Sequence, residues 1–444
     1  MFDTIAAIAT PPGVGGVGII RVSGPKAKEI GTALSLKTLS HQKAVYCSFL
    51  DSTEQPIDFG YLLFFKSPHS FTGEDIVEIQ GHGGPVVMDM VLQRVLQLGA
   101  RLAEAGEFSK QAFLNDKIDL VQAEAIADLI ESSSRTSVKL AQRALIGVFS
   151  NDIHSLSTNI IQLRMYIEAA LDFPEEEIDF ISEGKVLDKL NALIEELKLI
   201  LSKASQGALI REGLQLVIIG KPNVGKSTII NQLSGQETSI VTSIAGTTRD
   251  VIREQILIDD IPIHVLDTAG LRESVDEVEK EGIRRAMKAV EAADLILLVT
   301  DLKQSDPETI ASFIQENNID GPLLVVVNKI DIDAIEPKIS EDKVYISAKQ
   351  GAGMALLKSE ILVRAGACQQ EAQGAYLARR RHLDALERAL QLLNTGQDNL
   401  NEHNAGELLA DDLKYAHLAL CEITGEFSAD DLLGQIFSSF CIGK

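Results

Sequence analysis

Phosphate binding is the clearest chemistry that this sequence encodes. The segment GKPNVGKS, Gly220 to Ser227, has the spacing G-x-x-x-x-G-K-S, follows the apolar run LQLVIIG and precedes the helix-like segment STIINQLSG. In this context, backbone N–H groups and a helix N-terminus surround phosphate groups. Lys226 is expected to reach the β- and γ-phosphates, and Ser227 to coordinate Mg²⁺. A chance match in a glycine-rich turn is the competing interpretation of this motif alone.

Three further motifs select the nucleotide. DTAG ends an apolar run, so Asp267 can hold Mg²⁺ through water and the Gly270 N–H can meet the γ-phosphate. NKID ends another run, and its Asp331 carboxylate can accept hydrogen bonds from guanine N1–H and N2–H₂, which adenine does not offer. SAK, Ser347 to Lys349, supplies a backbone contact to the base. The four motifs stand in the order found in Ras-like GTPases and together predict GTP.

The residues for hydrolysis differ from those of Ras. Leu271 follows DTAG where Ras-type enzymes carry the glutamine that orients the attacking water. GTTRD, Gly246 to Asp250, is the expected switch loop, with Thr248 suited to Mg²⁺ coordination. Asn223 and switch-loop carbonyls could hold a monovalent cation in place of an arginine finger, which is worth about 10³ to 10⁵ in rate. The alternative is that Asn223 only braces the loop.

These motifs need a parallel sheet to bring them together. Near-continuous apolar runs, typical of buried parallel strands, occur at LQLVIIG, IHVLD, DLILLVT, LLVVVN and VYIS. Helix-length segments separate them, which indicates a Ras-like P-loop α/β domain over residues 211–368.

The flanking regions differ in character. Residues 1–118 mix β-like runs such as VGIIRVSG and GYLLFF with glycine-rich turns and one helix-like run, which predicts an α/β domain. Long helical stretches are expected from Ala123 to about Ala170 and from Val186 to Lys203. One further helical face carries Leu383, Leu386, Leu390 and Leu393. We therefore expect one helical domain, residues 119–210 and 369–444, which the GTPase domain interrupts.

Composition restricts the partners and the compartment. The 444 residues carry a formal net charge of −23, so nonspecific RNA binding is disfavoured without a local basic patch or a basic partner. There is no long apolar run and no basic secretory start, so we expect a cytoplasmic protein that does not enter a membrane. The four scattered cysteines indicate neither a disulfide framework nor a zinc site.

Two smaller features leave alternatives open. The C-terminal FCIGK fits a prenylation signal poorly because Gly443 and Lys444 end it. Cys441 is therefore either a catalytic thiol, which needs a nearby base or cation, or a small hydrophobe. His82 in GHGG suggests a metal ligand or a general base, although a glycine-rich turn is favoured.

The chain also resembles one family over nearly its whole length. The resemblance is carried by ATPPGVGGVGIIRVSG, SFTGEDIVEIQGHGG, GEFSKQAFLNDKIDLVQAEAIADLI, GKPNVGKSTIIN, IAGTTRD, DTAGLRE and FCIGK, and it points to the MnmE (TrmE) tRNA-modification GTPases. It implies a folate-binding, dimerising N-terminal domain and potassium-dependent GTP hydrolysis driven by association of GTPase domains. It also implies work with the FAD-dependent partner MnmG, in which a carboxymethylaminomethyl or aminomethyl group is added to C5 of the wobble uridine of certain tRNAs. The tRNA would be held mainly by that partner.

The resemblance assigns cofactors and roles to individual residues. The implied cofactors are potassium, magnesium and 5-formyl- or methylene-tetrahydrofolate. The implied potassium ligands are Asn223, Thr242, Ile244 and Thr247, the magnesium ligands are Ser227 and Thr248, and the folate contacts are Arg21, Glu78, Lys117 and Lys444. The implied catalytic residues are Lys226, Asn223 and Glu279, of which Glu279 would orient the water. The full set expected at GTP is Asn223, Val224, Gly225, Lys226, Ser227, Thr228, Thr242, Ser243, Ile244, Ala245, Gly246, Thr247, Thr248, Asp267, Thr268, Ala269, Gly270, Asn328, Lys329, Ile330, Asp331, Ser347, Ala348 and Lys349.

Two departures and one alternative accompany the resemblance. Gln111 and Asp116 stand where the family commonly has arginine and glycine, which affects the expected shape of the folate pocket but none of its named residues. The alternative function is a regulatory or ribosome-assembly GTPase. Such proteins carry an RNA-binding domain with a basic face, and this acidic sequence shows no such segment.

Overall fold

The computed structural model describes most of the chain, in two compact units that are treated separately below. The described residues are 3–132, 134–172, 185–235, 253–267, 293–316, 319, 321–340, 342–364, 374–403, 405–426 and 430–443. The first unit comprises Met1–Ala127, Leu145–Glu183 and Thr395–Lys444, and the second comprises Asp128–Ala144 and Gly184–Asn394. The domain boundaries expected from the sequence stay a prediction.

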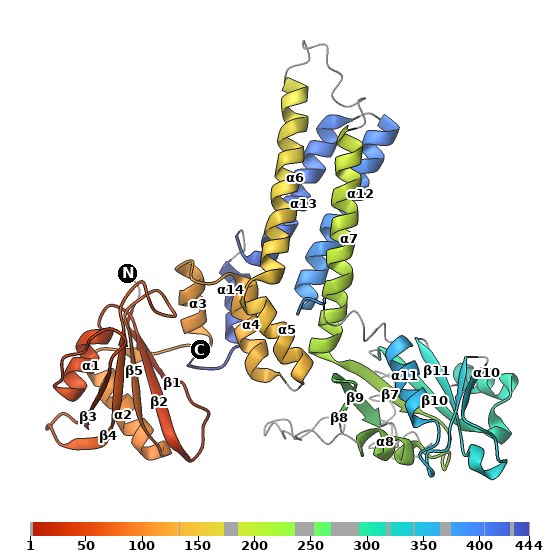
Figure 1. Ribbon diagram of the computed structural model, residues 1–444, viewed down its shortest axis with the longest axis horizontal. Coiled ribbons are helices and arrows are strands. Elements are labelled where there is room, and N and C mark those ends of the chain that lie inside the picture. The colour runs from red at the N-terminus through yellow and green to blue at the C-terminus, as the bar shows by residue number, and fades with distance from the viewer. Residues whose placement is uncertain are drawn as a thin grey trace. The chain divides into compact units, whose positions relative to one another are not determined.

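A mixed sheet forms one part of the first unit. Its strand order is β3-β4-β5-β2-β1-β6, and α1 and α2 pack on one face of it (Figure 1). Strand residues alternate between a buried and a more exposed side, so Leu62, Val77 and Ile79 form a core with Ile30 of α1 and Val95 of α2. The elements are β1 (Ile5–Ile8), β2 (Gly15–Ser23), α1 (Ala27–Ser35), β3 (Ala44–Leu50), β4 (Pro56–Phe65), β5 (Ile76–Gly83), α2 (Pro85–Gln97) and β6 (Arg101–Leu102).

Helices form the rest of the first unit. Helices α6 and α13 run side by side, as Figure 1 shows. A smaller core joins Leu120 of α4 to Phe437 and Phe440, which lie in and directly after α14. The helices are α3 (Glu107–Leu114), the first part of α4 (Leu120–Glu131), α6 (Val148–Asp172), the end of α12 (Arg380–His403), α13 (Gly406–Thr424) and α14 (Asp430–Ser438).

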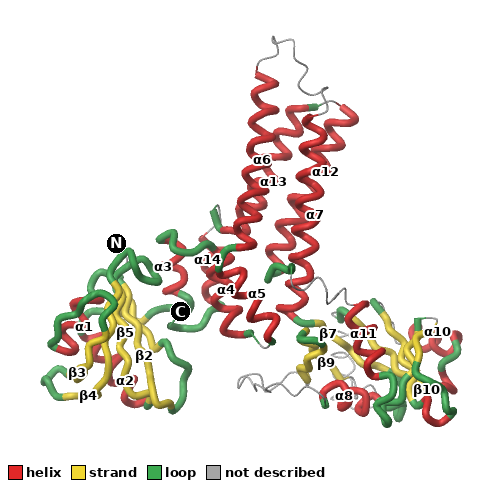
Figure 2. Tube along the Cα trace, viewed as in Figure 1, coloured by secondary structure: helices red, strands yellow, loops and turns green. Residues whose placement is uncertain are grey.

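A mostly parallel sheet forms the centre of the second unit, with strand order β12-β13-β11-β10-β7-β9-β8 (Figure 2). Strands β7, β9, β10, β11 and β13 are parallel, while β8 and β12 pair antiparallel to their neighbours. The elements are α5 (Arg135–Leu145), α7 (Lys185–Glu212), β7 (Leu214–Ile219), α8 (Lys226–Ser234), β8 (Arg253–Ile258), β9 (Ile261–Asp267), β10 (Leu295–Asp301), η1 (Leu302–Gln304), α10 (Pro307–Glu316), β11 (Leu323–Asn328), η2 (Ile330–Ile332), β12 (Lys338–Ser340), β13 (Lys343–Tyr345), α11 (Met354–Arg364) and the start of α12.

The sequence predicted both the strands and the helical regions. All five apolar runs form strands of the parallel sheet, as expected. The region from Ala123 to about Ala170 is helical, as expected, and the structure divides it into α4, α5 and α6. Ser134 and Ser137 exchange side-chain to backbone hydrogen bonds at the start of α5, and Gly147 has a left-handed φ of 84° before α6. Helix α7 also continues past Lys203 to Glu212.

A glycine lets two distant segments of the second unit meet. A Cβ atom on Gly207 of α7 would collide with the carbonyl oxygen of Tyr376, and residues Ala375 to Ala378 are buried. The Tyr376 N–H donates to the carbonyl oxygen of Lys203 at 3.1 Å. The segment that leads into α12 therefore lies directly on the backbone of α7.

We expect Gly207→Ala to lower the stability of the second unit by about 1–3 kcal/mol, because the added methyl group must displace backbone atoms. Thermal unfolding followed by circular dichroism would measure the change. Gly434→Ala in α14 is a matched control, since a Cβ there meets no atom within 4 Å, and alanine favours a helix over glycine by roughly 0.5–1 kcal/mol. Equal melting temperatures for Gly207→Ala and the wild-type chain would contradict the close contact.

Candidate GTP-binding site

The predicted motifs meet at one edge of the second sheet. The strands that precede them are parallel, so their C-terminal ends lie at the same edge, where ligands bind in open α/β sheets. The register places Ile218 of β7 beside Asp267 of β9, and Asp301 of β10 beside Asn328 of β11. Strand β10 pairs with both β7 and β11, so the segments that begin at Gly220 and Asn328 lie at the same edge with one strand between them, although about a hundred residues separate them in the chain.

The loop Gly220–Ser227, called the P-loop below, uses its glycines for close packing. Gly220 and Gly225 have φ values of 147° and 102°, and a Cβ atom on either would collide with a neighbour. Those neighbours are the Val299 carbonyl oxygen and the Asn328 side-chain amide, respectively. Only glycine combines this backbone conformation with so little space. The loop therefore presents its backbone, rather than side chains, around the start of α8.

Lys226 is the first residue of α8, and its ammonium group folds over the P-loop. Its Nζ atom donates to the carbonyl oxygens of Gly220 at 2.7 Å and Lys221 at 3.1 Å. Ser227 and Thr228 follow in the first turn and are exposed. A cation beside the N-terminus of a helix is suited to binding phosphate, because the free N–H groups of that first turn also attract anions. The geometry fits the role predicted for Lys226.

Asn328 ties the P-loop to the base-binding loop. It is 3% exposed, and its Nδ2 atom donates to the Val224 carbonyl oxygen at 2.9 Å. Its Oδ1 atom accepts a hydrogen bond from the Ala348 N–H, also at 2.9 Å. Sequence reasoning assigned Asn328 to GTP but missed this bridging role, which requires knowing that the three segments converge.

A hydrogen bond from the SAK segment orients the Asp331 carboxylate. Ser347 Oγ donates to Asp331 Oδ1 at 2.6 Å, and the half-buried Asp331 lies in η2 directly after Lys329, whose φ is 66°. The Ile346 N–H donates to the Val327 carbonyl oxygen, which keeps the SAK segment at the end of β11. An oriented carboxylate of this kind can accept two parallel N–H groups, the pattern that guanine presents and adenine lacks.

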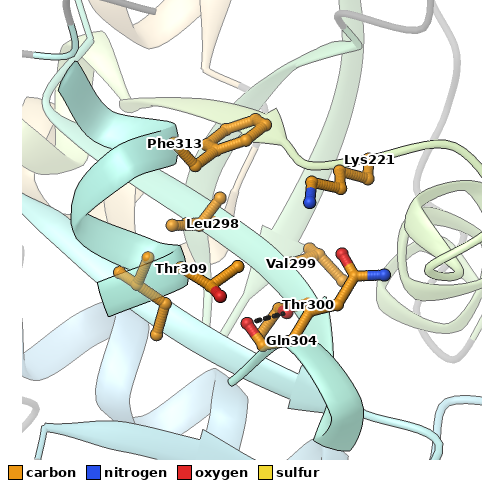
Figure 3. A pocket seen from close by; sticks show the side chains of 8 residues that line it. Lys221, Leu298, Val299, Thr300, Gln304, Thr309 and Phe313 are labelled. Carbon is orange, nitrogen blue, oxygen red and sulfur yellow. Dashed lines mark hydrogen bonds between the residues drawn. The ribbon is translucent and has the colours of Figure 1, made fainter. Parts of the chain in front are cut away.

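A small cavity lies behind the P-loop but is not the nucleotide site. Residues of β10 and α10 line it together with Gln304 and with Lys221 of the P-loop, as Figure 3 shows. Its volume of about 20 Å³ has room for a water molecule and not for a base or a phosphate chain. The cavity is therefore too small for a nucleotide, whereas the P-loop, NKID and SAK segments stand together at the C-terminal edge of the parallel strands.

Several predicted residues lie outside the described part of the chain. These are Thr242, Ser243, Ile244, Ala245, Gly246, Thr247, Thr248, Thr268, Ala269, Gly270, Glu279 and Lys444, and the side chain of Asp267 is likewise not described. Asn223 is exposed on the P-loop, with a φ of 65°, and Lys349 is exposed after β13. The described P-loop thus presents Asn223 to solvent.

The first unit brings together two of the residues expected to contact folate. Arg21 of β2 lies opposite Glu78 of β5, and Arg21 Nη2 is 2.9 Å from Glu78 Oε1. The Arg21 guanidinium also lies 5.7 Å from the ring centres of Phe71 and Phe108. The two side chains are about one-fifth exposed, so the pair is accessible from one side. Burial raises the pKa of the nearby Glu74 carboxyl, which also accepts a hydrogen bond from Ser23 Oγ.

Lys117 and the C-terminal tail lie on the same unit. Lys117 Nζ donates to the Pro68 carbonyl oxygen at 3.0 Å. Asp116 has a φ of 53°, a conformation that glycine adopts more easily, so this departure from the family pattern keeps the glycine-like backbone. Gly443 packs so closely against the Ile8 carbonyl oxygen that a Cβ atom would not fit, and Cys441 is exposed.

His82 is held by a buried carboxylate. Asp58 Oδ1 lies 2.7 Å from His82 Nδ1, and Asp58 Oδ2 accepts the His82 backbone N–H at 2.8 Å. Burial raises the pKa of Asp58, but these hydrogen bonds outweigh it and hold that pKa below its usual value. Among the residues that the structure describes, no group of three or more histidines, cysteines, aspartates or glutamates could hold a metal ion. None of the described helices is both long and apolar enough to cross a membrane.

These features define a P-loop GTPase domain, combined in one chain with helices and a separate mixed sheet. The family model described as the MnmE helical domain matches residues 120–441, and the one described as the GTP-binding protein TrmE N-terminus matches residues 4–117. Together the two models match nearly the whole chain. The chain therefore belongs to the MnmE (TrmE) family, which makes it a GTP hydrolase.

Individual relatives agree with this membership. A protein named tRNA modification GTPase MnmE from Legionella pneumophila (strain Paris) is 56% identical over 100% of this chain and 99% of its own length. Proteins of the same name from Hydrogenovibrio crunogenus and Pseudomonas aeruginosa (strain UCBPP-PA14) are 53% and 51% identical at the same coverage. Membership decides between the two function classes considered from the sequence, in favour of the tRNA-modification class.

We expect Asp331→Ala to weaken GTP binding by about 1–3 kcal/mol, on the order of 5- to 150-fold, because a bidentate base contact is lost. Weak ATP binding should not change, since adenine makes no such contact. Titration with fluorescent guanine and adenine nucleotides would measure both affinities. Asp333→Ala removes an exposed carboxylate two residues away and serves as the control. Equal losses for both nucleotides would contradict the assignment of Asp331 to guanine.

Proposed function

We propose that this GTPase acts with an FAD-dependent partner of the MnmG type to modify tRNA. The product is a carboxymethylaminomethyl or aminomethyl group at C5 of the wobble uridine, with a reduced folate as the one-carbon source. The observation that carries the proposal is the combination, in one chain, of the P-loop and NKID geometry with an accessible arginine and carboxylate pair on the N-terminal sheet. Full-length similarity to proteins named tRNA modification GTPase supports the substrate class.

GTP is bound and oriented by the P-loop edge. Lys226 and the first turn of α8 hold the phosphates, and the Asp331 carboxylate selects guanine. Mg²⁺ bound to Ser227 and Thr248 would neutralise charge on the phosphates. The remaining expected contacts, from Thr242 to Gly270, complete the site in this proposal.

Potassium is proposed to substitute for an arginine finger. Asn223 is exposed on the P-loop, and Leu271 cannot orient water as the Ras glutamine does. Asn223 would bind the ion together with Thr242, Ile244 and Thr247. A bound potassium ion supplies positive charge beside the phosphates, and Glu279 is proposed to orient the attacking water.

Folate is proposed to bind beside the Arg21 and Glu78 pair. Glu78 can accept hydrogen bonds from pterin N–H groups, and Arg21 can donate to a carbonyl or carboxylate. Lys117 and the terminal Lys444 suit the negatively charged glutamate tail. The close packing of Gly443 on Ile8 supports a position for the tail near β1, the strand that pairs with β2.

The proposed assembly is a cytoplasmic homodimer formed through residues 1–118, with the GTPase domain of residues 211–368 inserted into a helical domain of residues 119–210 and 369–444. The net charge of −23 favours a tRNA held mainly by the partner. The experiment that tests the proposal is reconstitution of the modified nucleoside from purified chain, partner, tRNA, GTP, Mg²⁺ and methylene-tetrahydrofolate. Omission of the chain or of the folate should abolish the product.

GTP hydrolysis should fall at least about tenfold when potassium is replaced by sodium at equal ionic strength, because the cation takes the place of a catalytic charge. Asn223→Ala should be slow in both salts and should still bind GDP. Phosphate release under single-turnover conditions is the measurement. Equal wild-type rates in the two salts would refute the cation role.

Arg21→Gln should weaken binding of 5-formyl-tetrahydrofolate about tenfold or more, since a charge-assisted hydrogen bond is lost. Isothermal titration calorimetry would measure this, and GTP hydrolysis should stay unchanged. Arg101→Gln is the matched control, because Arg101 lies on β6 of the same sheet and is also paired with carboxylates, those of Asp3 and Glu107. Folate affinity that is unaffected by Arg21→Gln would remove this residue from the proposed pocket.

A further inference from the structure

A buried carboxylate joins two distant arginines in the second unit. Asp128 Oδ1 accepts hydrogen bonds from Arg211 Nε at 2.9 Å and from Arg379 Nη2 at 2.8 Å. The Asp128 side chain is 7% exposed, and the two arginine side chains are 24% and 17% exposed. One oxygen atom thus holds two guanidinium groups. These three residues are called the arginine clamp below.

The positions of the arginines in the chain define what the clamp holds. Arg211 lies in the last turn of α7, and β7, the strand that leads into the P-loop, begins at Leu214. Arg379 directly precedes α12, the next described helix after α11 of the nucleotide-binding sheet. The clamp therefore fastens the chain just before the GTPase fold begins and shortly after it ends.

Further contacts fasten the same two segments. Lys203 Nζ lies 5.4 Å from the ring centre of Tyr376, and the Tyr376 backbone is hydrogen-bonded to Lys203 and packed on Gly207. Lys203, Gly207 and Arg211 are spaced by four residues, so they form one stripe along α7. Tyr376 contacts Lys203 and Gly207 of that stripe, and Arg379 shares Asp128 with its third member, Arg211. The GTPase fold is therefore anchored to α7 through both of its connections.

The third member of the clamp lies on a different helix. Asp128 is near the C-terminal end of α4, and Leu120 at the other end of α4 is buried with Phe437 and Phe440, directly before the C-terminal tail. A helix transmits a displacement along its length because its turns are hydrogen-bonded to one another. Movement of Asp128 can therefore pass along α4 to Leu120, and from there through side-chain packing to Phe437 and Phe440, which precede the tail that is proposed to contact folate.

The electrostatics favour the formed clamp. Asp128 places one negative charge between two guanidinium groups, and Glu212 Oε1 also lies 3.5 Å from Arg211 Nη1. If the Asp128 carboxylate moves away, both partly buried arginines lose a charge-assisted hydrogen bond, which is unfavourable. A displacement of α7 or of the segment before α12 therefore acts on Asp128 through these bonds.

We infer that Asp128 is a positioning residue that couples movements of the GTPase domain to α4, and through α4 to the tail. The inference rests on the proposed function, because it assigns GTP turnover to the control of folate-dependent modification. The inference adds Asp128, and the path along α4, to the proposed function, and neither belongs to the nucleotide site.

The test compares Asp128→Asn with the wild-type full-length chain in three measurements. These are GTP hydrolysis in potassium chloride, wobble-uridine modification in complemented cells, and hydrogen exchange of the α4 amides with and without GDP and aluminium fluoride. Asp128→Asn should hydrolyse GTP at the wild-type rate but lose about fivefold or more of the modified nucleoside. It should also lose the nucleotide-dependent change in α4 exchange. Glu360→Gln, which alters another carboxylate bound to an arginine, should behave as the wild type.

The possible outcomes separate this inference from the proposed function. Wild-type modification and a wild-type α4 response in Asp128→Asn would overturn the inference. Absence of modification with the wild-type chain would overturn the proposed function. The coupling would then be judged from hydrogen exchange alone, by whether the nucleotide changes α4 exchange in the wild type but not in Asp128→Asn. If hydrogen exchange is fast throughout Asp128→Asn, that variant is unfolded, and Arg379→Lys replaces it in the test. Lysine keeps the positive charge but lacks the planar fork of arginine, so Arg379→Lys should also lose the modified nucleoside and the α4 response. Wild-type modification and a wild-type α4 response in Arg379→Lys would contradict the clamp.

Discussion

The nucleotide site depends on the side-chain amide of Asn328. Its two ends make opposite hydrogen bonds, one donated to the P-loop at Val224 and one accepted from the base loop at Ala348. An aspartate at this position could accept from the Ala348 N–H but could not donate to the Val224 carbonyl oxygen. An alanine would leave both of these buried backbone groups without their partner. Because Gly225 lies against the same amide, Asn328 sets the separation of the P-loop from the SAK loop. The proposed selection of guanine by Asp331 depends on that separation.

Much of the fold around this amide could be predicted from sequence. Strands of a parallel sheet are buried on both faces, so segments such as DLILLVT and LLVVVN are recognisable without any partner. The helical breaks were harder, since Ser134 and Gly147 break the helix through local hydrogen bonds and backbone angles that a hydrophobic pattern does not reveal.

Contacts between side chains that are far apart in the sequence could not be predicted. Arg21 and Glu78 were each expected to contact a ligand, but their mutual ion pair follows from the register of β2 with β5, which sequence periodicity does not fix. The bridging role of Asn328 and the clamp at Asp128 likewise depend on segments that are far apart in the chain. A buried aspartate on a helix otherwise rich in apolar residues is the one local sign of the clamp.

The central claim is that GTP binding at this P-loop serves modification of the wobble uridine. The most direct measurement is mass spectrometry of tRNA nucleosides from cells that lack the chain and are complemented with either the wild type or Lys226→Ala. The account predicts that the modified wobble uridine disappears without the chain, returns with the wild type and stays absent with Lys226→Ala. Normal wobble-uridine modification in cells that lack the chain would contradict it.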